Sequence, residues 1–209
     1  LVLFAGNAIA ASYDAGGGSA TGSESVAIGD GATSQGIGSV AMGQYAKAVG
    51  TNTTAIGSGT TADGNDATAI GNNAQAIGMY STAVGDEAKA NQDFSTALGY
   101  QAEANHTGSA AIGFRAKTSG EDSAALGNSA EASGEESLAL GNSAAASGKQ
   151  SNAIGWWAKA TAQDATAIGS GAKADGENAI VLGKNSFVQD KDSIAIGSGA
   201  TVKSDNPGI

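Results

Sequence analysis

The sequence predicts an all-β fold, a parallel β-roll built from 14-residue coils, and three observations lead to that prediction. The 33 glycines among 209 residues fall at regular intervals. Between them, short segments alternate small and larger residues, which is the period of a strand. Only 5% of residues are aromatic and the apolar residues are largely alanine, so any core must be thin. Stacked identical coils can share a core that one coil could not bury alone.

The period is carried by a glycine that recurs every fourteen residues without insertion or deletion. It stands at Gly29, Gly43, Gly57, Gly71, Gly85, Gly99, Gly113, Gly127, Gly141, Gly155, Gly169, Gly183 and Gly197. Each of these repeat glycines ends a phrase similar to S-x-A-I-G, and residues 25–29 and 193–197 are its outermost copies. The slot two residues before the glycine holds alanine in every copy except Val181, which indicates room for little more than a methyl group.

A second phrase, A-x-A-x-G, follows each repeat glycine, as at residues 46–50 and 172–176. Because successive strand residues face opposite sides, the small residues of both phrases share the inside of the coil. The polar x positions of the second phrase then face water. We therefore expect two short strands and two tight turns per coil. About thirteen coils stacked at ~4.8 Å each would form two parallel sheets roughly 60 Å long.

The outer face of the first phrase carries one aliphatic side chain per coil, a row termed the aliphatic stripe. It consists of Ile28, Met42, Ile56, Ile70, Val84, Leu98, Ile112, Leu126, Leu140, Ile154, Ile168, Leu182 and Ile196. Full burial of such a side chain is worth about 1.5 to 3 kcal/mol, and an exposed row of this size marks an interface. The stripe therefore predicts a homo-oligomer of parallel chains around a common axis. The reverse assignment places the stripe inside each coil and alanine outside, and it predicts a monomer.

These phrases resemble the head repeats of the trimeric autotransporter adhesins, specifically the YadA-like head domains, over residues 16–204. The resemblance implies a left-handed β-roll, a homotrimer, and display on the cell surface of a Gram-negative bacterium. The anchor in its outer membrane would lie outside this chain. The resemblance also implies cell adhesion in virulence, to extracellular matrix protein, to the host-cell surface or to an abiotic surface. Heads of this family often have asparagine before the serine, whereas only Asn52 and Asn178 fill that slot here. A specific ligand such as collagen is therefore not carried over.

The array divides the chain into three parts. Residues 1–15 precede the array and are expected to form an N-terminal cap or part of a preceding element, with Leu1 to Phe4 closing the open end of the roll. Residues 16–204 form the roll itself. Residues 205–209, which include Pro207, leave the pattern and are expected to begin a neck or connector.

The residue types needed for catalysis or metal binding are scarce. A pI of about 4.3 and a net charge of −10 argue against nucleic acid and anionic membrane as partners. His106 is the single histidine, in a slot that usually holds glycine, and there is no cysteine. The carboxylates lack the repeat of a calcium roll, and the period of fourteen does not fit the hexapeptide helix of acyltransferases. We expect no enzyme, no catalytic residue, no metal and no cofactor.

Aromatic residues flank the stripe and allow two interpretations. Tyr100, Phe114 and Trp156 directly follow a repeat glycine, and Trp157 comes next. These side chains either seal the edges of the trimer interface or form an adhesive patch, for which Trp156 and Trp157 are the best candidates.

Two alternatives to an adhesin remain for the chain as a whole, a purely structural spacer and an ice-binding solenoid. The second rests on the ladder of Thr54, Thr68, Thr82 and Thr96.

Overall fold

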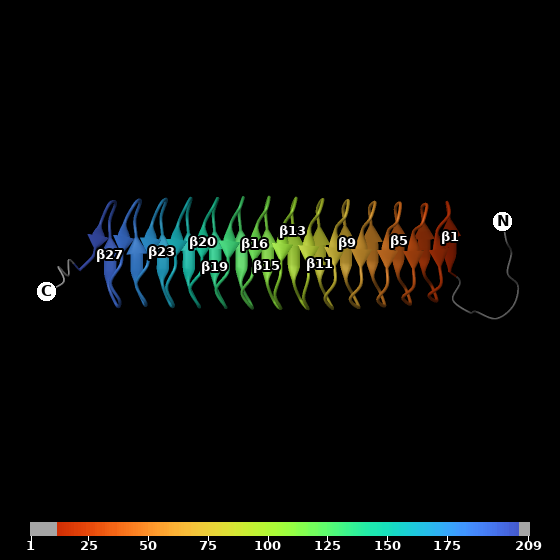
Figure 1. The fold of residues 1–209 in the computed structure, drawn as a ribbon, viewed down its shortest axis with the longest axis horizontal. Helices are drawn as coiled ribbons and strands as arrows, with labels where there is room; N and C mark the ends of the chain where they lie inside the picture. The colour runs from red at the N-terminus through yellow and green to blue at the C-terminus, as the bar shows by residue number, and fades with distance from the viewer. Residues whose placement is uncertain (1–11, 205–209) are drawn as a thin grey trace, which may run out of the picture.

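The structure is a computed structural model that describes residues 12–204, and these residues form a single stack of coils (Figure 1). Each coil gives one strand to each of two 14-stranded sheets, and in both sheets the strand order follows the sequence. All strand pairs are parallel, from β1 beside β3 to β26 beside β28. The all-β parallel roll expected from the sequence is confirmed for these residues.

Three-residue strands form the first sheet and two-residue strands form the second. The first sheet consists of β1 (Tyr13–Ala15), β3 (Val26–Ile28), β5 (Val40–Met42), β7 (Thr54–Ile56), β9 (Thr68–Ile70), β11 (Thr82–Val84), β13 (Thr96–Leu98), β15 (Ala110–Ile112), β17 (Ala124–Leu126), β19 (Leu138–Leu140), β21 (Asn152–Ile154), β23 (Thr166–Ile168), β25 (Ile180–Leu182) and β27 (Ile194–Ile196). The second consists of β2 (Ser19–Ala20), β4 (Thr33–Ser34), β6 (Lys47–Ala48), β8 (Thr61–Ala62), β10 (Gln75–Ala76), β12 (Lys89–Ala90), β14 (Glu103–Ala104), β16 (Lys117–Thr118), β18 (Glu131–Ala132), β20 (Ala145–Ala146), β22 (Lys159–Ala160), β24 (Lys173–Ala174), β26 (Phe187–Val188) and β28 (Thr201–Val202).

The stack begins earlier than the sequence pattern indicated. Tyr13 of β1 pairs with Val26 of β3, thirteen residues along, whereas later neighbours such as Thr54 and Thr68 are fourteen apart. Each sheet therefore has fourteen strands where thirteen coils were expected. This first coil has Asp14 and Ala15 where later coils have alanine and an aliphatic residue, so it does not show the phrase. The cap expected at Leu1 to Phe4 and the connector expected at 205–209 lie outside the described residues.

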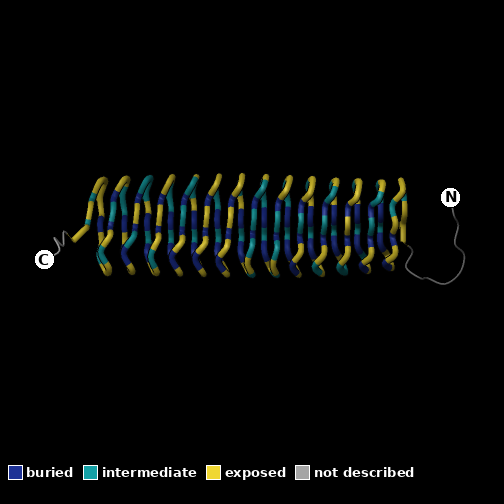
Figure 2. Tube along the Cα trace, viewed as in Figure 1, coloured by how far each residue is buried: buried dark blue, intermediate teal, exposed yellow. Residues whose placement is uncertain are grey.

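The core is a column of alanine methyl groups between the two sheets. The alanine before each stripe residue and both alanines of the second phrase are fully buried, as at Ala41, Ala46 and Ala48. Buried residues follow the middle of both sheets and exposed residues gather at the turns (Figure 2). Larger buried side chains appear near the C-terminal end, at Val181 and Val188. Because alanine lies inside, the reverse assignment of the faces is wrong.

The serine that begins the first phrase bonds to the preceding turn. The hydroxyl of Ser39 donates to the carbonyl oxygen of Gly36 at 2.6 Å, and that of Ser123 donates to Gly120 at 2.7 Å. A buried hydroxyl without such a partner is costly, so a short side chain that reaches the turn carbonyl suits this slot. Within residues 12–204, Ser81 and Thr118 are buried hydroxyl residues whose oxygen atoms have no hydrogen-bond partner.

The repeat glycines are required by both conformation and space. At Gly99 the φ angle is 133°, in a region that other residues rarely adopt. A Cβ placed there would lie 2.4 Å from the carbonyl oxygen of Gly113 in the next coil. The same close stacking recurs along the column, which explains why no copy of the phrase replaces this glycine.

Candidate interaction surfaces

The described residues offer surfaces rather than a catalytic pocket. Within residues 12–204, no group of three or more histidine, cysteine, aspartate or glutamate residues is placed to hold a metal ion. Nor does that part of the chain contain a helix with the length and apolar character needed to cross a membrane. The outer faces of the two sheets and the two rows of turns are therefore the candidates for function.

The aliphatic stripe lies on the outer face of the first sheet, as the sequence predicted. Its members stack in register, and Ile56 pairs directly with Ile70. Neighbouring coils already cover more than half of most of these side chains, so Ile56 and Ile70 are each 37% exposed and Leu140 is 41% exposed. An interface would therefore gain about 0.5 to 1 kcal/mol per side chain, less than the value for full burial. Ile196, in the last coil, is 70% exposed.

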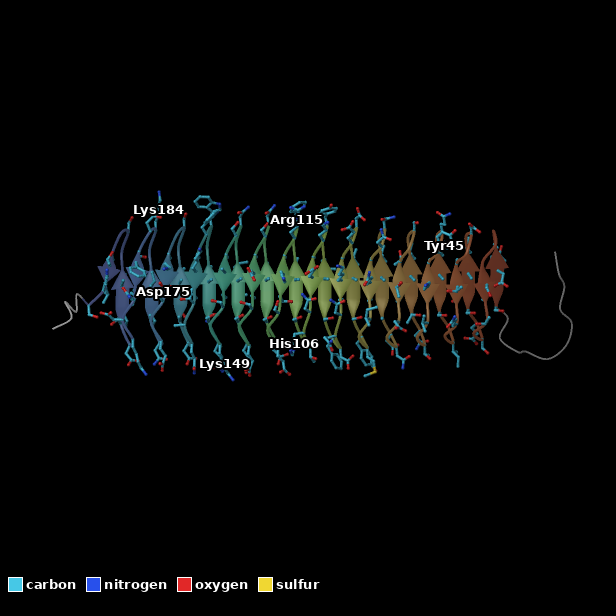
Figure 3. All side chains as sticks on the ribbon, in the orientation of Figure 1. Tyr45, His106, Arg115, Lys149, Asp175 and Lys184 are labelled. Carbon is cyan, nitrogen blue, oxygen red and sulfur yellow. The ribbon has the colours of Figure 1, made fainter. Side chains whose placement is uncertain are left out.

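The turns form two opposite edges of the roll. The turns that follow the repeat glycines, such as residues 113–115, form an edge termed the glycine edge. The turns that lead back to the first sheet, such as residues 120–122, form the return edge. Tyr45, Arg115 and Lys184 lie toward one edge, whereas His106 and Lys149 lie toward the other (Figure 3).

The four predicted aromatic residues all lie on the glycine edge, two or three residues beyond the stripe. Tyr100 and Phe114 stack with their ring centres 5.2 Å apart, and the guanidinium of Arg115 lies 5.0 Å from the Phe114 ring. Trp156 and Trp157 form a tilted pair at 5.7 Å, and they are 58% and 51% exposed. Two exposed indoles on neighbouring residues of a turn are available to a ligand or to a second chain.

The return edge carries a second aromatic pair together with ladders of charged and polar side chains. Tyr80 and Phe94 stack at 5.3 Å, close to parallel. Further along, Lys149 pairs with the carboxylate one coil before it, Glu135, at 2.9 Å. That hydrogen bond and charge raise the pKa of Lys149, and Glu177 raises the pKa of Lys191 in the same way. The lysines are thus held in the charged form. A search for pairs fourteen residues apart would have found these ladders in the sequence.

Both edges hold their outer residue in a left-handed conformation. The φ angle is 57° at Tyr45 and 58° at Trp157 on the glycine edge, and 57° at Tyr80 and 59° at Phe94 on the return edge. Glycine occupies the same slots in other coils, for example at Gly31. This recurrence of glycine was the sequence signal for the turn conformation, and it was missed.

The outer face of the second sheet is polar and mixed in charge. Lys89 and Glu103 pair at 3.5 Å on adjacent strands. A shallow depression there is lined by Glu87, Lys89, Gln101, Glu103, Arg115 and Lys117. Opposite charges that pair within the face leave little net field, so this face does not select a partner by charge alone.

Family repeats account for nearly all of this architecture. The YadA head domain repeat matches residues 20–46, 48–74, 76–102, 94–116, 104–130, 118–144, 132–158, 146–172, 160–186, 174–200 and 190–206. The chain belongs to the YadA head domain family. YadA-like heads are structural adhesin domains of bacterial cell-surface proteins, and the family is not a family of enzymes.

Other comparisons add little beyond the family. None of the curated proteins compared matches the chain. Among solved structures, the collagen-binding domain of the Yersinia adhesin YadA matches at 26% sequence identity with a TM-score of 0.45. That match covers 62% of this YadA-like head, and the head spans 64% of the solved chain, just under two thirds of it.

Proposed function

We propose that this YadA-like head forms a parallel homotrimer through its aliphatic stripe. The observation that carries the proposal is an unbroken aliphatic row facing outward on a chain whose own core is complete without it. Thirteen side chains at about 0.5 to 1 kcal/mol each would contribute roughly 6 to 13 kcal/mol per chain before the cost of association. Membership of the YadA head family supports three as the number of chains.

In this proposal the trimer is the adhesive head of a surface fibre, anchored in the outer membrane of a Gram-negative bacterium by a segment outside this chain. Its targets would be extracellular matrix protein, the host-cell surface or an abiotic surface. The same backbone surface is repeated coil after coil, so adhesion would rest on many weak contacts made at once. The residues before β1 would serve as cap or as the end of a preceding element, the stack from β1 to β28 as the roll, and residues 205–209 as the start of the connector.

A direct test compares the trimer with a dissociated variant. Purified protein is first examined by sedimentation equilibrium. It is then passed over immobilised matrix proteins, including collagen, and over bare plastic, beside a variant in which stripe residues are replaced to give monomers. The proposal expects retention of the trimer and at least a tenfold loss for the monomer, because avidity can raise affinity by about a hundredfold or more. Equal retention of both species would refute multivalent adhesion.

The spacer alternative is favoured by the uniform coils and by the mixed charge of the second sheet. It predicts a trimer that is retained by none of the surfaces.

Replacing Trp156 and Trp157 by serine separates the two roles proposed for the aromatic residues. Loss of retention with an intact trimer supports the adhesive patch, whereas weakened assembly supports the interface seal.

A further inference from the structure

The two edges display large side chains at positions where the backbone disfavours them. A left-handed conformation costs a residue other than glycine about 1 to 2 kcal/mol. Nevertheless Tyr45 and Trp157 on the glycine edge, and Tyr80 and Phe94 on the return edge, adopt φ angles of 57° to 59°. Strain that is kept at defined positions points to a use for the side chains held there.

The symmetry of a parallel trimer determines what each edge would meet. In a cyclic assembly whose first sheets face a common axis, the contacts are head-to-tail around the ring. The glycine edge of each chain therefore lies beside the return edge of the next chain, at the same height along the axis. This arrangement rests on the proposed trimer, and in it the glycine edge of one chain contacts the return edge of the next.

The charges of the two edges are complementary in the C-terminal half. Between residues 114 and 199 the turns of the glycine edge carry Arg115 and Lys184 and no carboxylate. The facing turns of the return edge carry Glu121, Asp122, Glu135, Glu136, Asp164, Glu177, Asp190 and Asp192, with only Lys149 and Lys191 among them. Among the ion pairs within residues 12–204, none involves Arg115, Lys184 or Asp122.

Arg115 and Asp122 occupy successive turns of one coil, and both side chains lean toward the N-terminal end. Nε of Arg115 donates to Oε1 of Gln101 at 2.9 Å, one coil back. The carboxylate of Asp122 lies over Gly108, also one coil back. The two charged groups therefore sit at similar heights on opposite edges, where a neighbouring chain would bring them together.

The aromatic pairs of the two edges also overlap in height. Phe94 ends the turn before β13, and Tyr100 begins the turn after β13, so both belong to the same coil. The Tyr80 and Phe94 stack lies on the return edge, and the Tyr100 and Phe114 stack lies on the glycine edge. Across two adjacent chains, these stacks would pack together and cover the contact between the two edges, termed the seam. They would lie on the N-terminal side of the charged pair.

We propose that the glycine edge binds the return edge of a second copy of this chain, through an ion pair between Arg115 and Asp122 and contact between the two aromatic stacks. The seam sets the axial register of the chains, because a shift by one coil would separate both contacts. The stripe supplies apolar burial that is nearly the same at every coil, so it cannot set that register by itself.

Charge reversal tests the pair. Arg115→Glu is expected to raise the concentration at which the trimer half-dissociates by about tenfold or more, because like charges then meet at all three seams. Adding Asp122→Arg in the same chain is expected to restore the midpoint to within about threefold, since the pair is re-formed in reverse. Lys117→Glu is the matched control, because Lys117 lies in the same coil on the outer face of the second sheet.

Cysteine cross-linking tests the geometry without relying on affinity. The chain has no cysteine, so Ser129→Cys on the glycine edge together with Glu136→Cys on the return edge introduces the only thiols. On oxidation the double variant is expected to form covalent dimers and trimers, and neither single variant is expected to cross-link. Cross-linking by a single variant would overturn the head-to-tail seam, as would failure of the charge swap to restore a trimer weakened by Arg115→Glu. A wild-type monomer in sedimentation would instead overturn the proposed trimer itself.

Discussion

Replacing Ile56 and Ile70 by threonine removes apolar contact from the middle of the aliphatic stripe while keeping β-branched residues in the strands. Each isoleucine is 37% exposed in the single chain. At about 1.5 to 3 kcal/mol for full burial, the part still open to an interface is worth about 0.5 to 1 kcal/mol per side chain. A trimer contains six such side chains, so the loss is about 3 to 6 kcal/mol per trimer.

The loss appears as a shift in the concentration at which the trimer half-dissociates. Since about 1.4 kcal/mol is tenfold in an equilibrium constant, the association constant falls by about 10² to 10⁴. The midpoint of a trimer varies as the square root of that constant, so it rises by about 10- to 100-fold. Sedimentation equilibrium over a dilution series measures this shift, and circular dichroism checks that the roll remains folded.

The control for this prediction is a matched pair of substitutions on the other sheet. Val49 and Ile77 are 37% and 38% exposed on the outer face of the second sheet, which faces away from the proposed axis. Replacing both by threonine is expected to leave the midpoint unchanged. Equal shifts in the two double variants, or no shift in either, would refute the assignment of the stripe to an interface.

Three other predictions concern the roll itself. Gly99→Ala would place a Cβ 2.4 Å from the Gly113 oxygen, and it is expected to lower the free energy of unfolding in urea by about 2 to 6 kcal/mol. Gly197→Ala is the control, because its Cβ would meet no atom within 4 Å and the variant bears only the cost of the unfavourable φ angle. Ala97→Val overfills a fully buried slot and is expected to cost about 1 to 3 kcal/mol in the same assay; an unchanged urea midpoint would contradict a close-packed lumen. Because its glutamate partner raises the pKa of Lys149 above 10.5, the pair's contribution is present below pH 10.5 and is lost as pH rises through the raised value. The melting temperatures of wild type and Lys149→Gln, measured across that pH range, should therefore differ less at high pH than at neutral pH.

Residues that face the lumen could be placed from the sequence because each slot there admits few side chains. Gly43 and Ala41 recur since a larger group would strike the next coil or the opposite sheet. The first coil was missed because Asp14 and Ala15 break that pattern and its register is thirteen residues. The strands are short, as expected: the five-residue phrases contain only three and two residues of strand. Alternation continues into turns, where side chains still face in or out.

Outward-facing residues were harder to interpret because stacking imposes almost nothing on them. The slot of Arg115 holds glycine, serine, asparagine, glutamine, glutamate, tyrosine or tryptophan in other coils, and each of these fits the same turn. Contacts between side chains fourteen residues apart, such as Asn52 donating to Asp66, depend on which residues happen to be neighbours in the stack. Such contacts become visible in the sequence only after the register is known.

The same division between inside and outside explains how one roll can change its binding properties without losing its fold. An outward substitution on a strand costs little when the lumen and the glycine column are kept, as the slot of Lys117 shows, which holds threonine, glutamine or glutamate in other coils. Outward residues that are held against a backbone preference are the exception, because glycine would be favoured there. Trp157, with a φ angle of 58° and a side chain about half exposed, meets that criterion. We therefore expect residues of this kind, rather than the residues that make the fold, to distinguish this head from others with the same coil.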